Sequence, residues 1–348
     1  MMNSFERTMA AVSHTEPDRV PLFLLLSLYG AKELQVPIKE YFSKPSDIVH
    51  AQLSMKKKYR NDCIYTFFYA PIEIEAWGGE VLFFDDGPPN SGEPFIKSLD
   101  QIDRIEVPRI SESKCLKRVL DTTQMLKQKV GNETPIIGVV MSPFSVPVMQ
   151  MGFEKYIELI YEREDVFNKL MQVNEKFCVS WANAQLESGA TAICYFDPLA
   201  SPNIIDKDTY MKTGWEVAKR TISRINGPTA THLASGISLP VIDDIIKTGT
   251  AILGFSADDD IVKIKKAAKN KICLLGNMNA IEMRNWNYKR TIQEIKGIIA
   301  KAGKGGGLLL ADNHGEIPWQ VPEDVLLWIS EAVHEFGSYP LRWTEDYE

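Results

Sequence analysis

Eight short apolar stretches recur along the chain of 348 residues, and longer stretches with helical periodicity separate most of them. They cover residues 20–26, 63–69, 135–141, 190–196, 228–232, 251–257, 271–276 and 307–311. Strands that alternate with helices pair in parallel and are covered on both faces, so they are apolar throughout rather than at every second residue. This pattern belongs to the α/β class and predicts a single (β/α)8 TIM barrel as one domain over residues 1–348.

Two additions to the barrel are expected. A helix over residues 4–13 forms an N-terminal helical extension before the first strand, and residues 70–89 form an insertion after strand 2 that contains a hairpin. The alternative fold is an open doubly wound sheet, which needs a glycine-rich phosphate-binding loop after an early strand. The glycines at 305–307 precede the last strand instead, so we interpret them as a turn.

Polar side chains follow the apolar stretches, and the carboxyl ends of barrel strands meet on the rim that holds the active site. They are Ser27, Tyr29, Tyr69, Glu73, Glu75, Ser142, Asp197, His232, Ser235, Asp258, Asn277, Asn279, Asp312, Asn313 and His314. In the triplet 258–260 that opens a helix, one aspartate is expected to cap the helix and only Asp258 to look into the barrel.

Of the five histidines, only His232 and His314 end strands. Two imidazoles with one or two carboxylates suit a zinc ion with an open coordination position. In the competing interpretation one histidine is a general acid or base whose pKa a neighbouring aspartate sets. Sequence spacing leaves both open. The catalytic candidates are His232, His314, Asp197, Asp258 and Asn277, with His232 and His314 as candidate zinc ligands.

An aromatic surface is predicted on the second strand, where alternation would turn Tyr65, Phe67 and Tyr69 to one side. Such a surface suits an apolar or aromatic substrate. A polyanionic substrate is not expected, because the chain has no arginine between Arg19 and Arg60. The substrate-binding candidates are Tyr29, Tyr65, Phe67, Tyr69, Glu75, Phe144, Asp312 and Asn313.

Composition narrows the class of partner. The net charge of −7 and the pI near 5.5 argue against nucleic acid or an anionic membrane as the main partner, because both select for a basic surface. No apolar run is long enough to span a membrane, and the first residues lack a signal-peptide core. We therefore expect a cytoplasmic protein whose five scattered cysteines are buried, reduced thiols.

Several segments, in their order and spacing along essentially the whole chain, resemble the uroporphyrinogen decarboxylase superfamily. They are Phe5-Glu6-Arg7-Thr8-Met9-Ala10, Pro17-Asp18-Arg19-Val20-Pro21, Glu75-Ala76-Trp77-Gly78-Gly79, Gly276-Asn277-Met278-Asn279, His314-Gly315-Glu316-Ile317-Pro318 and Pro322-Glu323-Asp324-Val325. The family fold is a (β/α)8 barrel. Its corrinoid-dependent methyltransferase branch includes methylcobamide:coenzyme M methyltransferase and the first component of O-demethylases.

Departures from the family pattern indicate the branch. Decarboxylases of the family carry an arginine-bearing segment after strand one, which the leucine-rich residues 24–30 replace here, so the carboxylates of uroporphyrinogen would lack cationic partners. Thiol-methylating members bind zinc through His-x-Cys and a later cysteine. Here His232 matches, Ala234 cannot ligate, and His314 occupies the last position, which would make a harder nitrogen and oxygen site.

The resemblance therefore implies an enzyme that moves a methyl group from a methoxylated, aromatic substrate to cob(I)alamin on a corrinoid-binding partner protein. Zinc on His232 and His314, or a proton from either one, would stabilise the leaving oxygen, and the second strand would hold the ring. Transfer from a methylcorrinoid to a small acceptor, a decarboxylase-like activity and a binding protein stay open. Members of the family commonly pair, so a homodimer is also implied.

Overall fold

Eight parallel strands curl into a barrel in the structure, a computed structural model that describes residues 1–346. The strands are β1 Leu22–Phe23, β2 Ile64–Tyr65, β5 Ile136–Met141, β6 Ala192–Phe196, β7 Thr229–His232, β8 Ile252–Gly254, β9 Cys273–Met278 and β10 Leu308–Asp312. Their order around the barrel is β1-β10-β9-β8-β7-β6-β5-β2. The predicted (β/α)8 fold is confirmed, and the doubly wound alternative is excluded.

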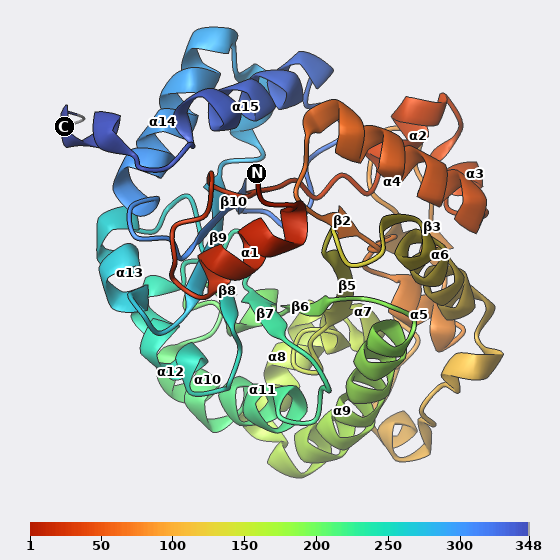
Figure 1. Cartoon of the computed structure of the whole chain (residues 1–348). Coiled ribbons are helices and arrows are strands. Elements are labelled where there is room, and N and C mark those ends of the chain that lie inside the picture. The colour runs from red at the N-terminus through yellow and green to blue at the C-terminus, as the bar shows by residue number, and fades with distance from the viewer. Residues whose placement is uncertain (347–348) are drawn as a thin grey trace.

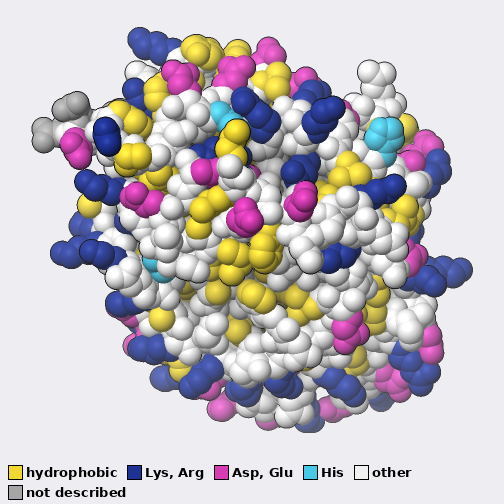
Figure 2. All heavy atoms as spheres, in the orientation of Figure 1, with side chains coloured by type: hydrophobic (Ala, Val, Ile, Leu, Met, Phe, Trp, Pro, Cys, Tyr) yellow, Lys and Arg dark blue, Asp and Glu magenta, His cyan; other side chains and the backbone are white. Residues whose placement is uncertain are grey.

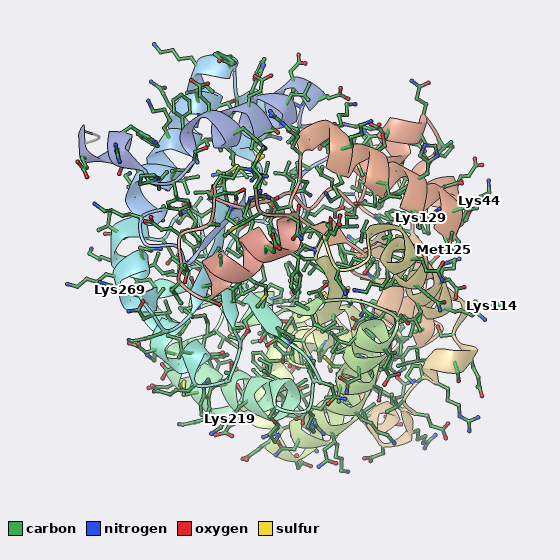
Figure 3. The ribbon with its side chains drawn as sticks, viewed as in Figure 1. Lys44, Lys114, Met125, Lys129, Lys219 and Lys269 are labelled. Atoms are coloured by element: carbon green, nitrogen blue, oxygen red, sulfur yellow. The ribbon has the colours of Figure 1, made fainter. Side chains whose placement is uncertain are left out.

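A ring of helices surrounds the strands (Figure 1). They are α1 Ser4–Val12, α2 Tyr29–Leu34, α3 Ile38–Tyr41, α4 Pro45–Tyr59, α5 Ile72–Ala76, α6 Lys114–Val130, α7 Pro147–Met151, α8 Phe153–Glu162, α9 Glu164–Glu187, α10 Lys207–Lys212, α11 Gly214–Ile222, α12 Ile242–Ile246, α13 Ile261–Ala268, α14 Tyr288–Ala302 and α15 Glu323–Phe336. Side chains such as Lys44, Lys129 and Lys269 project outward from this ring (Figure 3). No helix within residues 1–346 is long and apolar enough to cross a membrane.

The N-terminal extension α1 lies across the amino-terminal end of the barrel (Figure 1). Its start is fixed by a capping box in which Asn3 accepts from the Glu6 N–H and Glu6 accepts from the Asn3 N–H. Its end is tied to the last strand, because the Gly307 N–H donates to the Ala11 carbonyl at 2.9 Å. This end of the molecule carries acidic and basic side chains interspersed around its periphery (Figure 2).

Strands β1 and β2 are shorter than predicted, because one backbone hydrogen bond and several side-chain hydrogen bonds, rather than a regular backbone ladder, close the barrel between them. The Asp62 N–H donates to the Leu22 carbonyl at 2.8 Å, and the Leu22 N–H donates to the Asp62 carboxylate at 2.9 Å. One residue earlier, the Asn61 amide accepts from the Leu24 N–H and donates to the Leu24 carbonyl. Arg7 and Arg19 pair with Asp62 at 2.8 and 2.6 Å. A buried cluster of ion pairs therefore stabilises the seam, the junction at which β1 and β2 close the barrel.

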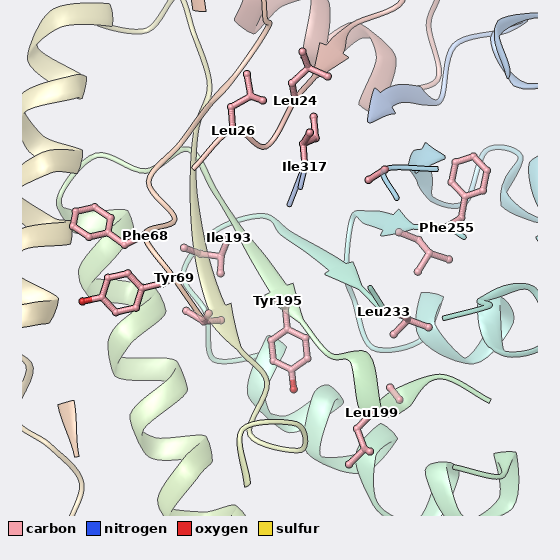
Figure 4. Packing of buried hydrophobic residues seen from close by; sticks show 14 of the residues in the cluster. Leu24, Leu26, Phe68, Tyr69, Ile193, Tyr195, Leu199, Leu233, Phe255 and Ile317 are labelled. Atoms are coloured by element: carbon pink, nitrogen blue, oxygen red, sulfur yellow. The ribbon is translucent and has the colours of Figure 1, made fainter. Parts of the chain in front are cut away.

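Apolar side chains fill two layers, as expected for strands covered on both faces. The inner layer lies inside the barrel and includes Phe23, Tyr65, Ile137, Cys194, Ala230, Leu275 and Leu309. The outer layer lies between strands and helices, where Figure 4 shows Leu24, Ile193, Tyr195 and Phe255. All five cysteines are buried and free, as predicted.

The insertion after β2 consists of α5 and the antiparallel pair β3 Val81–Leu82 and β4 Asn90–Ser91. The glycines before β10 are a turn, as expected, since Gly305, Gly306 and Gly307 have φ of 80°, 68° and 69°. Such left-handed conformations favour glycine.

Candidate active site at the carboxyl end of the barrel

A cavity of about 410 Å³ opens at the carboxyl ends of the strands. Leu25, Phe67, Val139, Cys194 and Phe196 form its inner walls. Residues 87–90 of the insertion and 318–320 of the segment after β10 form its outer wall, and the Gln320 amide donates to the Asp86 carbonyl at 2.9 Å to join them. Among the described residues that line the cavity, none is lysine or arginine. The cavity therefore suits an apolar ligand without anionic groups.

The end of β10 places His314 on the cavity wall. The Asp312 carboxylate accepts from the N–H groups of His314 and Gly315 at 3.0 and 2.8 Å, which turns the chain over the barrel mouth. Gly315 has φ of 96°, and a Cβ there would lie 2.5 Å from the Phe196 ring, so the turn requires glycine. His314 is exposed to the solvent, with its Nδ1 2.6 Å from the Ser235 hydroxyl.

Glu316 lines the same cavity and was not among the predicted site residues. The Ser27 hydroxyl donates to one of its carboxylate oxygens. Burial raises the pKa of Glu316 to about 7. A carboxyl group in such surroundings can hold or give a proton near neutral pH. The sequence feature that could have pointed to Glu316 is its position two residues after His314, in the segment that follows the last strand. Its hydrogen bond with Ser27, from the loop after the first strand, is visible only in the tertiary structure.

His232 lies buried beside this wall at the end of β7. Its ring stacks on Phe196, with centroids 5.4 Å apart and planes 25° apart. The Ala234 N–H donates to its Nδ1 at 3.0 Å. Burial, and secondarily the charge of His314, lower the pKa of His232 to about 4. At neutral pH its imidazole is therefore uncharged.

A zinc ion on His232 and His314 does not fit these residues as they lie. A metal needs a nitrogen lone pair, whereas the Nδ1 of His232 already accepts a hydrogen bond, which puts the proton of the neutral ring on Nε2. Within residues 1–346, no three His, Cys, Asp or Glu side chains form a group able to hold a metal ion. The carboxylates predicted to complete a metal site are engaged elsewhere.

Asp197 is one of those carboxylates. It is buried outside the cavity, where one oxygen accepts from the hydroxyls of Ser142 and Ser145, each at 2.6 Å. Its other oxygen has no partner, and burial raises the pKa of Asp197 to about 6. We assign Asp197 to joining the ends of β5 and β6 rather than to catalysis.

The prediction that Asp258 looks into the barrel is wrong, because Asp258 is exposed on the surface. The buried aspartate of the triplet is Asp259, which accepts from the backbone of Ser238 and Leu239, and Asp260 caps α13 as expected of one member. The short β8 ends at Gly254, so strand alternation no longer decides which aspartate turns inward.

Asn277 and Asn313 hold neighbouring strand ends together. The Asn277 amide donates to the Ser256 carbonyl at 2.9 Å. The Asn313 amide lies between the Met278 carbonyl, to which it donates at 2.9 Å, and the Ala257 N–H. The Asp312 carboxylate accepts hydrogen bonds from the backbone of its own loop. All three lie at the predicted rim, but their polar atoms bind the protein itself.

Of the three aromatic residues predicted to share one side of the second strand, two point into the barrel and the third does not. Tyr65 packs inside the barrel and Phe67 lines the cavity. Tyr69 instead points outward and donates to Glu75 at 2.6 Å, in a hollow where Arg118 pairs with Glu75. Regular alternation fails because β2 ends at Tyr65 and the chain then turns into α5.

Phe144 and Tyr29 also lie away from the cavity. Phe144 is buried between the rings of Tyr156 and Phe167. The Tyr29 hydroxyl donates to the carbonyls of Pro318 and Val321, so it supports the segment that forms the outer wall. Of the predicted substrate-binding residues, Phe67 alone is among the described residues that line the cavity.

A barrel with an apolar cavity at the carboxyl ends of its strands is the architecture of (β/α)8 enzymes. Residues 3–336 match the uroporphyrinogen decarboxylase (URO-D) family, and the chain belongs to this family.

The proteins similar in sequence to this chain include both methyltransferases and decarboxylases. The methylcobamide:CoM methyltransferase MtaA of Methanosarcina barkeri is 24% identical over 257 residues, which are 72% of this chain and 73% of that protein. The uroporphyrinogen decarboxylase of Legionella pneumophila (strain Lens) is 26% identical over 293 residues, 81% of this chain and 80% of that protein. Among solved structures, a methyltransferase from Methanosarcina mazei has a TM-score of 0.85 at 20% identity, covering 97% of this chain and 99% of that chain. The last likeness shows the fold.

Proposed function

We propose that this protein is a corrinoid-dependent methyltransferase that takes a methyl group from a methoxylated aromatic substrate and passes it to cob(I)alamin on a separate corrinoid protein. The observation that carries the proposal is the cavity at the barrel mouth. Its walls are apolar and aromatic, the described lining residues include no lysine or arginine, and its polar side chains include His314 and Glu316. An aromatic ether needs an apolar pocket and a proton source for its oxygen, and this cavity combines the two.

The charge of the cavity argues against uroporphyrinogen as the substrate. A substrate with many carboxylates needs several cationic partners in a desolvated site, each charge-assisted hydrogen bond contributing about 1.5–3 kcal/mol. The described residues that line this cavity include no lysine or arginine to supply such partners. A decarboxylase activity on that substrate is therefore disfavoured.

The residues of this chain would bind and orient the ether. Phe67, Phe196 and Trp319 would hold the ring, and the methyl group would point to the open mouth. The corrinoid of the partner protein would supply the nucleophile. As the bond between methyl carbon and oxygen breaks, the oxygen keeps the electron pair, and His314 or Glu316 would donate a hydrogen bond or a proton to it.

The proposal is tested with purified protein, a corrinoid protein reduced to the cob(I)alamin state, and a panel of methoxyarenes and methylamines. The absorbance change on methylation of the corrinoid reports transfer. We expect turnover with methoxyarenes, a loss of at least about 100-fold in His314→Ala, and no change in His50→Ala, whose side chain is exposed on α4. Failure of transfer across the whole panel would refute the proposal.

The likeness to the methylcobamide:CoM methyltransferase of Methanosarcina barkeri favours a second candidate, in which the methyl group moves from a methylated corrinoid protein to a small acceptor. Product analysis distinguishes the two directions. Incubation with a methylated corrinoid protein and thiol or phenol acceptors would give methylated products at a catalysed rate only if the second direction operates.

A further inference from the structure

The short turn after β7 contacts both histidines of the site at the same ring atom. The Ala234 N–H donates to Nδ1 of His232 at 3.0 Å, and the Ser235 hydroxyl lies 2.6 Å from Nδ1 of His314. We propose that this turn fixes both imidazoles in the Nε2–H tautomer, so that they serve as hydrogen-bond donors and not as metal ligands. Their use on a leaving oxygen rests on the proposed function, whereas the tautomers do not.

The argument for His232 needs only the chemistry of the backbone. A backbone N–H can donate but never accept, so the nitrogen that it contacts must carry the lone pair. A neutral imidazole has one ring proton, which must then lie on Nε2. Nδ1 is occupied by the hydrogen bond and Nε2 by the proton, so neither nitrogen is free to bind a metal ion.

The surrounding structure holds the His232 ring in this orientation. Phe196 covers one face of the ring. Gly254 leaves the room that the ring occupies, because a Cβ there would lie 2.6 Å from its Cδ2. A ring flip would replace the acceptor Nδ1 by a carbon and leave the Ala234 N–H without this partner.

The turn itself adopts an unusual conformation. Ala234 has φ of 51°, a left-handed conformation that costs a residue with a Cβ roughly 1–2 kcal/mol. It is held by the hydrogen bond from the Gly236 N–H to the Leu233 carbonyl and by that from the Ser256 hydroxyl to the Ser235 carbonyl. The conformation directs the Ala234 N–H back to the histidine two residues earlier.

For His314 the contact comes from a hydroxyl, which can donate or accept. Among the described residues, His314 is the hydrogen-bond partner of the Ser235 hydroxyl, so donation to Nδ1 satisfies that hydroxyl and leaves the ring proton on Nε2. Ser235 is thus a positioning residue that acts through His314. The Nε2–H of His314 would then be a donor on the cavity wall, where it could stabilise a developing oxyanion, whereas His232 stays buried behind that wall.

The tautomers are measured directly by two-bond 1H–15N correlation spectra of the full-length protein with 15N-labelled histidine, and His232→Gln and His314→Gln assign the signals. We expect the Nε2–H pattern for both rings at neutral pH. In Ser235→Ala the His314 signals should move towards a mixture of tautomers, Ser235→Thr should restore them, and His232 should stay unchanged as the internal control. An Nδ1–H pattern at His232 would overturn the proposal.

Zinc binding gives an independent readout. After equilibrium dialysis against zinc chloride, neither histidine should hold a zinc ion. Wild type and His314→Ala should therefore retain equal amounts of zinc. One zinc per chain in the wild type, lost in His314→Ala, would refute the donor assignment. Neither measurement needs the substrate. Absence of methyl transfer would therefore refute the proposed function, but it would not affect the assignment of the two tautomers.

Discussion

Replacing Asp62 should cost a large part of the protein's stability, because this carboxylate closes the barrel between β1 and β2. It is 1% exposed and accepts from Ser4, Arg7, Arg19 and the Leu22 N–H. In Asp62→Ala the guanidinium groups of Arg7 and Arg19, only 8% and 11% exposed, lose this partner and the Leu22 N–H loses its acceptor. Removing one partner from such a buried pair costs about 3–5 kcal/mol.

The assay is urea unfolding followed by circular dichroism, which gives the change in free energy of unfolding. Asp62→Asn should fall between wild type and Asp62→Ala, because its amide oxygen can still accept from Leu22 but carries no charge. Asp103→Asn is the matched control. Its ion pair with Lys169 is equally short at 2.7 Å but more than half exposed, so we expect no measurable loss. A loss below about 1 kcal/mol in Asp62→Ala, the range of an exposed pair, would contradict this account of the seam.

Three further outcomes are expected. Burial raises the pKa of Glu73 to about 8, above its unfolded value near 4.5, so its contribution to stability is fully present below about pH 4.5 and is lost as the pH rises through 8. The difference in unfolding free energy between wild type and Glu73→Gln, measured at several pH values, should therefore change over this range. Gly315→Ala should lower the melting temperature and raise KM. The left-handed conformation alone costs roughly 1–2 kcal/mol for alanine, and the new methyl group would collide with the Phe196 ring. An unchanged KM would show that this turn does not shape the cavity. Gln320→Ala should change the unfolding free energy by less than about 0.5 kcal/mol yet raise KM, because it frees the outer wall from Asp86.

The barrel could be predicted because the sequence patterns that produce its strands and helices are local and recur along the chain. Each strand needs an apolar stretch and each helix an amphipathic one, and both periodicities are written along the chain. For β5 and β10, which are bound on both sides by backbone ladders, the predicted and observed strands differ by no more than one residue at either end, whereas β8, also bound on both sides, ends three residues earlier than predicted. Where side chains replace the ladder, at β1 and β2, the apolar pattern overestimated the strand.

The site could be predicted only in part, because a residue's place on the rim does not fix what its side chain contacts. His314 reaches the cavity wall as expected. Asp197 stands at a strand end too, but it lies outside the cavity, where it accepts from the hydroxyls of Ser142 and Ser145 in the loop after the preceding strand, β5. Tyr69 leaves the expected side because its strand ends four residues earlier.

The sequence by itself determined the barrel fold, the helix across its amino-terminal end and the place of His314 on the rim at the carboxyl ends of the strands. Each follows from residue type and spacing along one segment. Only the tertiary structure decided that Glu316 accepts a hydrogen bond from Ser27, that Asp259 rather than Asp258 is buried, and that a backbone N–H donates to Nδ1 of His232. Hydrogen bonds between the loops of different strands make these choices, and no single segment contains both partners.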